Sequence, residues 1–203
     1  MMMPMTDLGW GALLFWSVLA YGFGSIPSGV IIARLLGLGD LREIGSGNIG
    51  ATNVLRTGNK TAAALTLLFD AGKGALPVLL AFSFADEAAA HCASISALLG
   101  HCYPVWLRFK GGKAVATLLG VLLALFWPLG LLTCLAWLVA AAVFRVSSLA
   151  ALIASLSALL WAMLLGQEQL IALLLVLNAL VYWRHRANIA RLLQGSEPKI
   201  GQK

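Results

Sequence analysis

Charged side chains are scarce in this sequence, making up only 11% of its 203 residues, whereas a soluble domain carries roughly 25%. Apolar residues account for 61%, more than a small soluble core can hide from water. The same figure excludes low-complexity disorder, because disordered segments are poor in apolar residues. Cysteine is also scarce, and three cysteines cannot cross-link a disulfide-based fold. The composition therefore predicts an all-α, polytopic integral membrane protein.

The histidines and cysteines lack the spacing of a metal site. His91-Cys92 and His101-Cys102 form a repeated pair, but on one helix the separation of about ten residues corresponds to about 15 Å. One ion cannot bridge that distance, and Cys134 stands apart from both pairs. We therefore expect no metal and no other cofactor.

Seven apolar stretches are separated by short polar or charged connectors. In order they are Leu8–Ala33, Thr61–Phe84, Ala88–Leu107, Ala114–Trp127, Leu129–Phe144, Leu149–Leu165 and Leu170–Trp183. The first can cross about 30 Å of hydrocarbon with some tilt, and its glycines and Pro27 predict a kink or close packing there. Pro128 favours a turn between the fourth and fifth stretches over one kinked helix. The sequence thus predicts seven transmembrane helices in a single domain, residues 1–203.

The basic residues are distributed unequally between the connectors. With seven spans, thirteen of the fourteen Lys and Arg residues lie on one face or at its edge, and the exception, Lys73, lies inside a span. The opposite face receives only acidic charges, from Asp7, Asp86, Glu87 and Glu168. The positive-inside rule then places the N-terminus outside and the C-terminus in the cytoplasm. Six spans would place Arg145 outside, so seven are preferred.

The first cytoplasmic connector is rich in glycine and small polar residues. Its candidate ligand residues are Ser46, Gly47, Asn48, Thr52, Asn53 and Arg56. Glycines let backbone N–H groups approach a ligand closely, and hydroxyls, amides and one arginine suit an oxyanion such as phosphate. A dinucleotide-binding fingerprint at the same glycines is rejected, because no βαβ unit surrounds it. A flexible polar loop that only caps a helix remains the alternative.

Two further cytoplasmic segments place cations beside apolar spans. The candidates of the first are His101, Lys110, Gly111, Gly112 and Lys113. Two lysines around two glycines suit phosphate, but they would equally serve as a topology signal alone. In the second segment, His185 and Asn188 share a helical face, although a lipid-facing basic helix is the alternative there. Ser148 contributes a weaker fourth site on this face.

Asp70 and Lys73 are the charged residues inside a span. Such residues are functional candidates by default, but at a spacing of i,i+3 they can also pair with each other, and both interpretations stay open. A transporter of an organic phosphate, the alternative function, would use them near the middle of the bilayer and typically contains inverted repeats; the sequence shows no such repeat. Nucleic acid is excluded as a partner, since the basic residues lie in short connectors between spans.

Three long motifs resemble those of the bacterial acyl-phosphate:glycerol-3-phosphate acyltransferases. They are Gly45–Asn53 followed by Arg56, Gly100–Thr117, and His185–Ile189. Asp70-x-x-Lys73-Gly74 also looks like this family, and the resemblance extends from about Leu8 to Glu197. Ala114 departs from the pattern, because the family usually has glycine there.

The resemblance implies a seven-helix enzyme of the bacterial inner membrane with its active site facing the cytoplasm. Such an enzyme transfers a fatty acyl group from acyl phosphate to the sn-1 hydroxyl of glycerol 3-phosphate. The products are lysophosphatidic acid and phosphate, in the first step of phospholipid synthesis. Neither acyl-CoA nor acyl carrier protein would be a direct donor, and association with the enzyme that makes acyl phosphate fits this scheme.

The resemblance also assigns roles to individual residues. Glycerol 3-phosphate contacts are expected from Ser46, Arg56, Lys110, Ser148 and Asn188, and acyl phosphate contacts from the glycine-rich loops and His185. Ser46, Lys110 and His185 are the expected catalytic residues. Because acyl phosphate is already activated and its phosphate can accept a proton, orienting two anions would supply most of the catalysis. His185 and His101 are the candidates if a side chain acts as the base.

Overall fold

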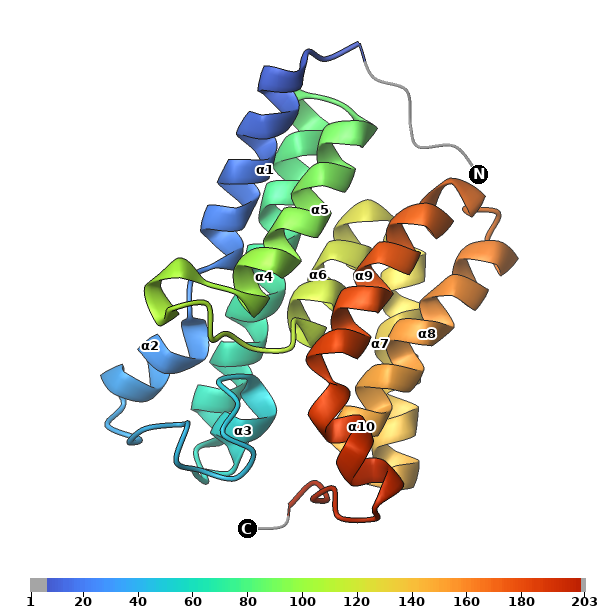
Figure 1. The fold of residues 1–203 in the computed structure, drawn as a ribbon. Helices are drawn as coiled ribbons and strands as arrows, with labels where there is room; N and C mark the ends of the chain where they lie inside the picture. The colour runs from blue at the N-terminus through green and yellow to red at the C-terminus, as the bar shows by residue number, and fades with distance from the viewer. Residues whose placement is uncertain (1–6, 202–203) are drawn as a thin grey trace.

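The computed structural model describes residues 7–201, and in this part of the chain all regular structure is helical (Figure 1). The α-helices are α1 (Trp10–Gly24), α2 (Ser28–Leu35), α3 (Ala51–Leu55), α4 (Lys60–Phe84), α5 (Glu87–Cys102), α6 (Val115–Leu125), α7 (Trp127–Phe144), α8 (Ser147–Leu164), α9 (Ile171–Arg184) and α10 (Arg186–Leu193). Short 3-10 helices follow α5 (Val105–Leu107) and α8 (Glu168–Leu170). The predicted all-α class is confirmed, whereas the N-terminus predicted to lie outside begins in residues 1–6, beyond the described part.

Polar caps and prolines set several helix ends. Asn59 and Asp86 each accept a hydrogen bond from the backbone N–H three residues on, at 2.9 and 2.8 Å, and so begin α4 and α5. Pro128 lies in the first turn of α7, where its missing N–H costs nothing. It therefore divides α6 from α7, as the sequence predicts, instead of kinking one long helix.

The predicted kink in the first apolar stretch is a break between α1 and α2. Pro27 lacks the N–H that would continue α1, and the chain turns at Ser25–Pro27 before α2 begins. The carbonyl of Ile26 in this break accepts hydrogen bonds from the Ser28 N–H at 3.0 Å and from Lys73 Nζ at 2.7 Å. A cation inside the second apolar stretch thus helps to satisfy a backbone group at the break.

Within residues 7–201, four helical segments are long and apolar enough to cross a membrane, namely α1 with α2, α4, α7 and α8, and the bent pair of α9 and α10 would make a fifth. Each of the seven predicted stretches nevertheless contains a helix, and α4 to α9 run in alternating directions (Figure 1). Membrane insertion is supported by the exposed leucines and valine of α7, Leu131, Leu135 and Val139. The count of seven spans stays a prediction.

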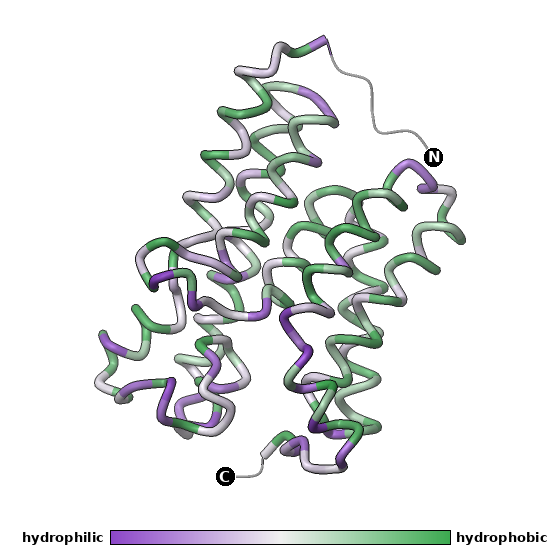
Figure 2. Tube along the Cα trace, viewed as in Figure 1, coloured by the Kyte–Doolittle hydropathy of each residue, from purple (hydrophilic) through white to green (hydrophobic). Residues whose placement is uncertain are grey.

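The bundle has two halves joined by α4 and α6. In one half α1 packs against α5 and α4, and in the other α7 packs against α8, which also contacts α9. Gly74 and Gly120 bring α4 and α6 into close contact, since a Cβ at either would overlap a carbonyl oxygen, that of Thr117 or Ala71. Hydrophilic residues gather in the loops around α2, α3 and α10, at one end of both halves (Figure 2).

Candidate active site

A cavity of about 490 Å³ lies at this end, between the two halves. Its polar lining residues are Ser46, Asn48, Thr52, Asn53, Arg56, Asp70, His101, Lys113, Ser147, Ser148, His185, Asn188 and Glu197. Its apolar wall includes Leu67 of α4, Leu119 of α6, and Trp137 and Leu138 of α7. One cavity therefore offers a polar, cation-bearing end and an apolar end.

The glycine-rich connector is held in place mainly by Asn53. This buried amide donates from Nδ2 to the Leu41 carbonyl at 2.7 Å and accepts from the backbone N–H of Ser46 at 3.2 Å. Gly45 and Gly47 have positive φ angles of 52° and 66°, a conformation that glycine adopts without strain. Asn53 thus fixes the loop that carries Ser46 into the cavity lining.

Arg56 lies over this loop, immediately after α3. A Cβ on Gly45 would overlap the Arg56 side chain, so the glycine leaves room for the guanidinium. Thr52 and Ser147 share a hydrogen bond of 3.1 Å that joins α3 to the start of α8. This contact brings the first connector next to Ser148, as the sequence predicts for residues of one face.

Gly111 and Gly112 have a packing role in the described structure. Their N–H groups donate to the carbonyls of Cys102 and His101, both at 3.1 Å. Their own carbonyls accept from Arg184, both at 2.9 Å. These N–H groups are thereby engaged within the protein, and neither glycine lines the cavity. The loop positions Lys113 instead of cradling a ligand with its backbone.

The two lysines of this loop are separated. Lys113 lines the cavity, while Lys110 is exposed and lines a different one. Arg108 and Phe109, just before Lys110, adopt positive φ angles of 51° and 61°. In the described structure Arg56 and Lys113 line one cavity and Lys110 lines another, while a joint phosphate site of Arg56 and Lys110 stays a prediction.

Lys113 lies among several charges. Its pKa is lowered to about 8, chiefly by burial and also by the neighbouring cations Arg191, Arg184 and Arg56, against the opposing effect of Glu197. The lysine therefore carries its charge at pH 7 and loses it as the pH rises through about 8. Ala114 follows at a φ angle of 58°, a left-handed conformation that the glycine expected here from the resemblance would adopt without strain.

His185 is buried at the bend between α9 and α10. Its Nδ1 lies 2.8 Å from the Val181 carbonyl; since a carbonyl only accepts, Nδ1 carries the proton and Nε2 is left as an acceptor. The pKa of His185 is lowered to about 4, chiefly by burial and also by the charge of Lys113, against the opposing effect of the hydrogen bond to Val181. The imidazole is thus neutral at pH 7.

Glu197 is a site residue to which the sequence assigned no role. Its carboxylate accepts hydrogen bonds from Ser148 Oγ at 2.6 Å, Asn188 Nδ2 at 2.5 Å and Arg191 Nε at 2.7 Å. Burial alone would raise the pKa of Glu197, but these hydrogen bonds and the charge of Arg191 lower it. The C-terminal segment therefore closes the cavity with an ionised carboxylate bound to two of the predicted substrate ligands.

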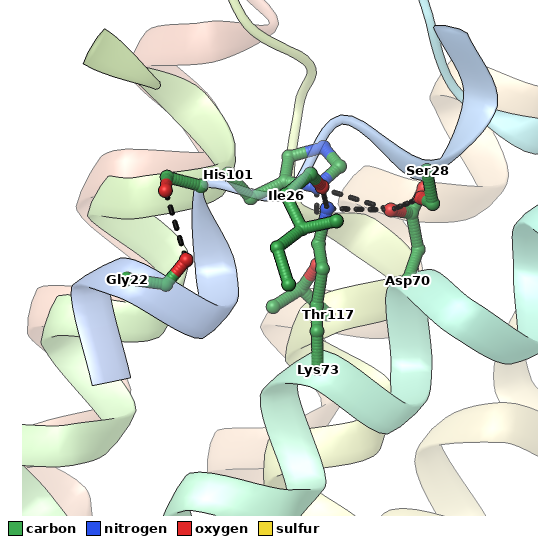
Figure 3. Close-up of polar contacts among 8 residues, drawn as sticks. Gly22, Ile26, Ser28, Asp70, Lys73, His101 and Thr117 are labelled. Atoms are coloured by element: carbon green, nitrogen blue, oxygen red, sulfur yellow. Dashed lines mark hydrogen bonds and ion pairs between the residues drawn. The ribbon is translucent and has the colours of Figure 1, made fainter. Parts of the chain in front are cut away.

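Asp70 and Lys73 pair with each other deep in the bundle, at 2.6 Å. Asp70 also accepts a hydrogen bond from Ser28 and lies 3.6 Å from His101 Nδ1, which is 3.2 Å from Thr117 Oγ1 (Figure 3). This network joins the α1–α2 break to α4, α5 and α6. The pairing of Asp70 with Lys73 is thus confirmed, while the ligand role stays a prediction, since Asp70 and His101 also line the cavity.

The fold and the cavity define a class: an integral membrane protein whose cavity suits a ligand with an anionic head and an apolar chain. The family model described as Glycerol-3-phosphate acyltransferase matches residues 14–195. The chain belongs to this glycerol-3-phosphate acyltransferase family.

Relatives named glycerol-3-phosphate acyltransferase extend the match over nearly the whole chain. The protein of Ruegeria pomeroyi is 60% identical over 99% of this chain and 99% of its own length. That of Roseobacter denitrificans is 58% identical over 95% of this chain and 96% of its own length. The resemblance in the three motifs thus reflects family membership.

Solved structures agree with this assignment. The crystal structure of PlsY (YgiH), an integral membrane glycerol 3-phosphate acyltransferase, in its glycerol 3-phosphate form has a TM-score of 0.88 at 42% identity, over 94% of this chain and 96% of that chain. Its lysophosphatidic acid form has a TM-score of 0.85 at 40% identity, with the same coverage.

Proposed function

We propose that this chain transfers a fatty acyl group from acyl phosphate to the sn-1 hydroxyl of glycerol 3-phosphate, in the cavity described above. The observation that carries this is the meeting of Arg56 and Lys113 with an apolar wall that includes Trp137 and Leu138 in one cavity. Guanidinium and ammonium groups bind phosphate oxygens, and the apolar wall can hold the acyl chain. The relatives' names and the two PlsY structures support glycerol 3-phosphate as the acceptor.

The geometry supports a division of the acceptor site. Arg56 and Lys113 hold the phosphate, and Ser148 with Asn188 receives the glycerol end. Glu197 already engages one donor of each of these two residues, so they offer acceptor atoms to hydroxyl groups. The Glu197 carboxylate also repels phosphate from that end, which fixes the direction in which glycerol 3-phosphate binds.

The transfer step needs no side-chain nucleophile. The sn-1 oxygen forms the ester bond to the acyl carbon, the bond from that carbon to the phosphate oxygen breaks, and the hydroxyl proton goes to the departing phosphate. With a pKa of about 4, His185 is a weak base at pH 7, and its free Nε2 suits it to orient a hydroxyl or a protonated phosphate oxygen. Orientation in a cavity can contribute roughly 7–11 kcal/mol.

The donor is tested with purified protein, labelled glycerol 3-phosphate and two donors, acyl phosphate and acyl-CoA. We expect labelled lysophosphatidic acid from acyl phosphate alone, because the cavity of about 490 Å³ has to hold glycerol 3-phosphate and the acyl chain as well as the donor head. Comparable turnover with acyl-CoA free of acyl phosphate would contradict this donor assignment.

We also propose seven spans in the bacterial inner membrane, with the C-terminus and the cavity facing the cytoplasm. The alternating directions of α4 to α9 and the one-sided basic residues support this. In a background without native cysteines, we expect cysteines at Glu168 and at Lys199 to react with an impermeant maleimide from opposite sides of the membrane. Labelling of both from one side would show that α9 does not cross the membrane and would contradict the seven-span arrangement.

A further inference from the structure

A second cavity has a volume of about 720 Å³. It shares no lining residue with the cavity of Arg56 and Lys113, which is called the catalytic cavity from here on. It is lined by α2, by the connector from Gly37 to Arg42 and by the segment from Trp106 to Lys110. Four of its lining residues are cations: Arg34, Arg42, Arg108 and Lys110. Lys110, which does not line the catalytic cavity, thus lines this one.

The positive charges of this cavity are not neutralised by the protein. Within residues 7–201, no carboxylate lies within ion-pairing distance of any of the four cations. Asp40 also lines the cavity, but its Oδ1 accepts from the backbone N–H of Arg42 at 2.9 Å. Four cations against one carboxylate leave an excess positive charge, which favours an anionic ligand.

Exposed apolar residues, called the rim below, lie in or next to the lining segments. Trp106 lines the cavity and is 67% exposed. Leu35, Leu36 (47% exposed) and Phe109 adjoin lining residues in the chain and are exposed as well. Trp106 is fixed by a hydrogen bond of 2.8 Å from its Nε1 to Ser25 Oγ. Aromatic side chains with basic neighbours are typical of the membrane–water interface. A free phosphate ion needs no such rim, whereas a lipid needs one for its acyl chains.

We infer that this cavity binds the headgroup of an anionic phospholipid from the surrounding leaflet. The lipid phosphate lies among Arg34, Arg42, Arg108 and Lys110, and its acyl chains leave along Trp106 and Leu36. Basic pockets between membrane helices bind anionic headgroups in the same manner.

The site is coupled to the catalytic cavity through the first connector. Leu41 lines the lipid cavity, and its carbonyl accepts the Asn53 amide that also holds Ser46. An occupied lipid site therefore stabilises the connector that carries Ser46. This coupling rests on the proposed function, whereas lipid binding itself does not.

Lipid binding is tested by native mass spectrometry of protein taken from bilayer discs of phosphatidylcholine with a minor fraction of phosphatidylglycerol. We expect retained phosphatidylglycerol on the wild type. In Arg34→Gln/Arg108→Gln we expect its affinity to fall about 25-fold, from about fivefold per cation. Neither side chain donates a hydrogen bond within residues 7–201, so the folded structure loses no contact of this kind. The matched control is Lys60→Gln/Arg145→Gln, which removes two exposed cations outside both cavities.

The outcomes separate the lipid from other anions. Equal loss of phosphatidylglycerol in both double variants, or equal retention in both, would overturn the site. Release of the lipid by millimolar inorganic phosphate would show a site for free phosphate instead and would equally overturn the inference. Failure of the acyl transfer assay with retained, variant-sensitive lipid binding would refute the proposed function alone.

Discussion

Arg56→Ala and Lys113→Ala are each expected to raise the KM for glycerol 3-phosphate by roughly one to two decades, because a hydrogen bond to a charged group is worth about 1.5–3 kcal/mol. Both side chains line the polar end of the catalytic cavity. If they also align the acceptor, kcat falls as well. Steady-state kinetics with acyl phosphate held at saturation separate the two effects.

Two comparisons make this prediction specific. Lys60→Ala removes an exposed cation outside the cavity and should leave the KM for glycerol 3-phosphate unchanged. Lys110→Ala should raise this KM much less than Lys113→Ala does, since Lys110 lines the other cavity. A large effect at Lys110 with none at Lys113 would contradict the described geometry of the loop.

The pH dependence provides an independent test of the same lysine. Because the pKa of Lys113 is lowered to about 8, the free enzyme loses this charge as the pH rises through 8, and kcat/KM for glycerol 3-phosphate should fall there. Lys113→Arg keeps its charge throughout this range and should show no such fall. An unchanged profile in Lys113→Arg would assign the titration to another group.

Glu197→Ala is expected to lower kcat/KM by at least a decade, although Glu197 belongs to the C-terminal segment. The substitution removes the acceptor of Ser148, Asn188 and Arg191 at once, so both glycerol ligands lose their orientation. Glu197→Gln, which keeps an oxygen acceptor but no charge, should be less impaired. Glu168→Ala, at the far end of the bundle, is the control.

A double-mutant cycle distinguishes this positioning role from general destabilisation. Glu197→Ala and Asn188→Ala act through the same hydrogen bond, so their combined cost in kcat/KM should be clearly smaller than the sum of the single costs. Additive costs, or a Glu197→Ala enzyme with wild-type kinetics, would show that the carboxylate does not position Asn188.

Helix ends and the composition of the site could be predicted from the sequence because their causes are local. Pro27 and Pro128 lack the N–H that a continuing helix needs, and helices are divided at both, whereas Pro77 lies inside α4. The hydroxyls, amides and cations of the connectors likewise indicated an anion site, and Ser46, Arg56, Ser148, His185 and Asn188 do meet in one cavity.

The choice between Lys110 and Lys113 could not be predicted, because both lysines flank the same two glycines. It depends on the left-handed backbone at Arg108 and Phe109, which residues other than glycine adopt rarely. Glu197 was missed for a similar reason. It follows a turn at Gly195, and no periodic pattern indicates that the segment folds back onto Ser148 and Asn188. The only signal in the sequence was that Glu197 follows the predicted amide ligand Asn188 by 9 residues.

The central claim is that the acyl group passes directly between two anions bound in one cavity. The most direct measurement is rapid-mixing detection of phosphate release after purified protein meets acyl phosphate, first without and then with glycerol 3-phosphate. Direct transfer predicts no stoichiometric phosphate release until glycerol 3-phosphate is added, and thereafter equal amounts of phosphate and lysophosphatidic acid. A burst of one phosphate per protein molecule before that addition would reveal an acyl-enzyme and contradict the account.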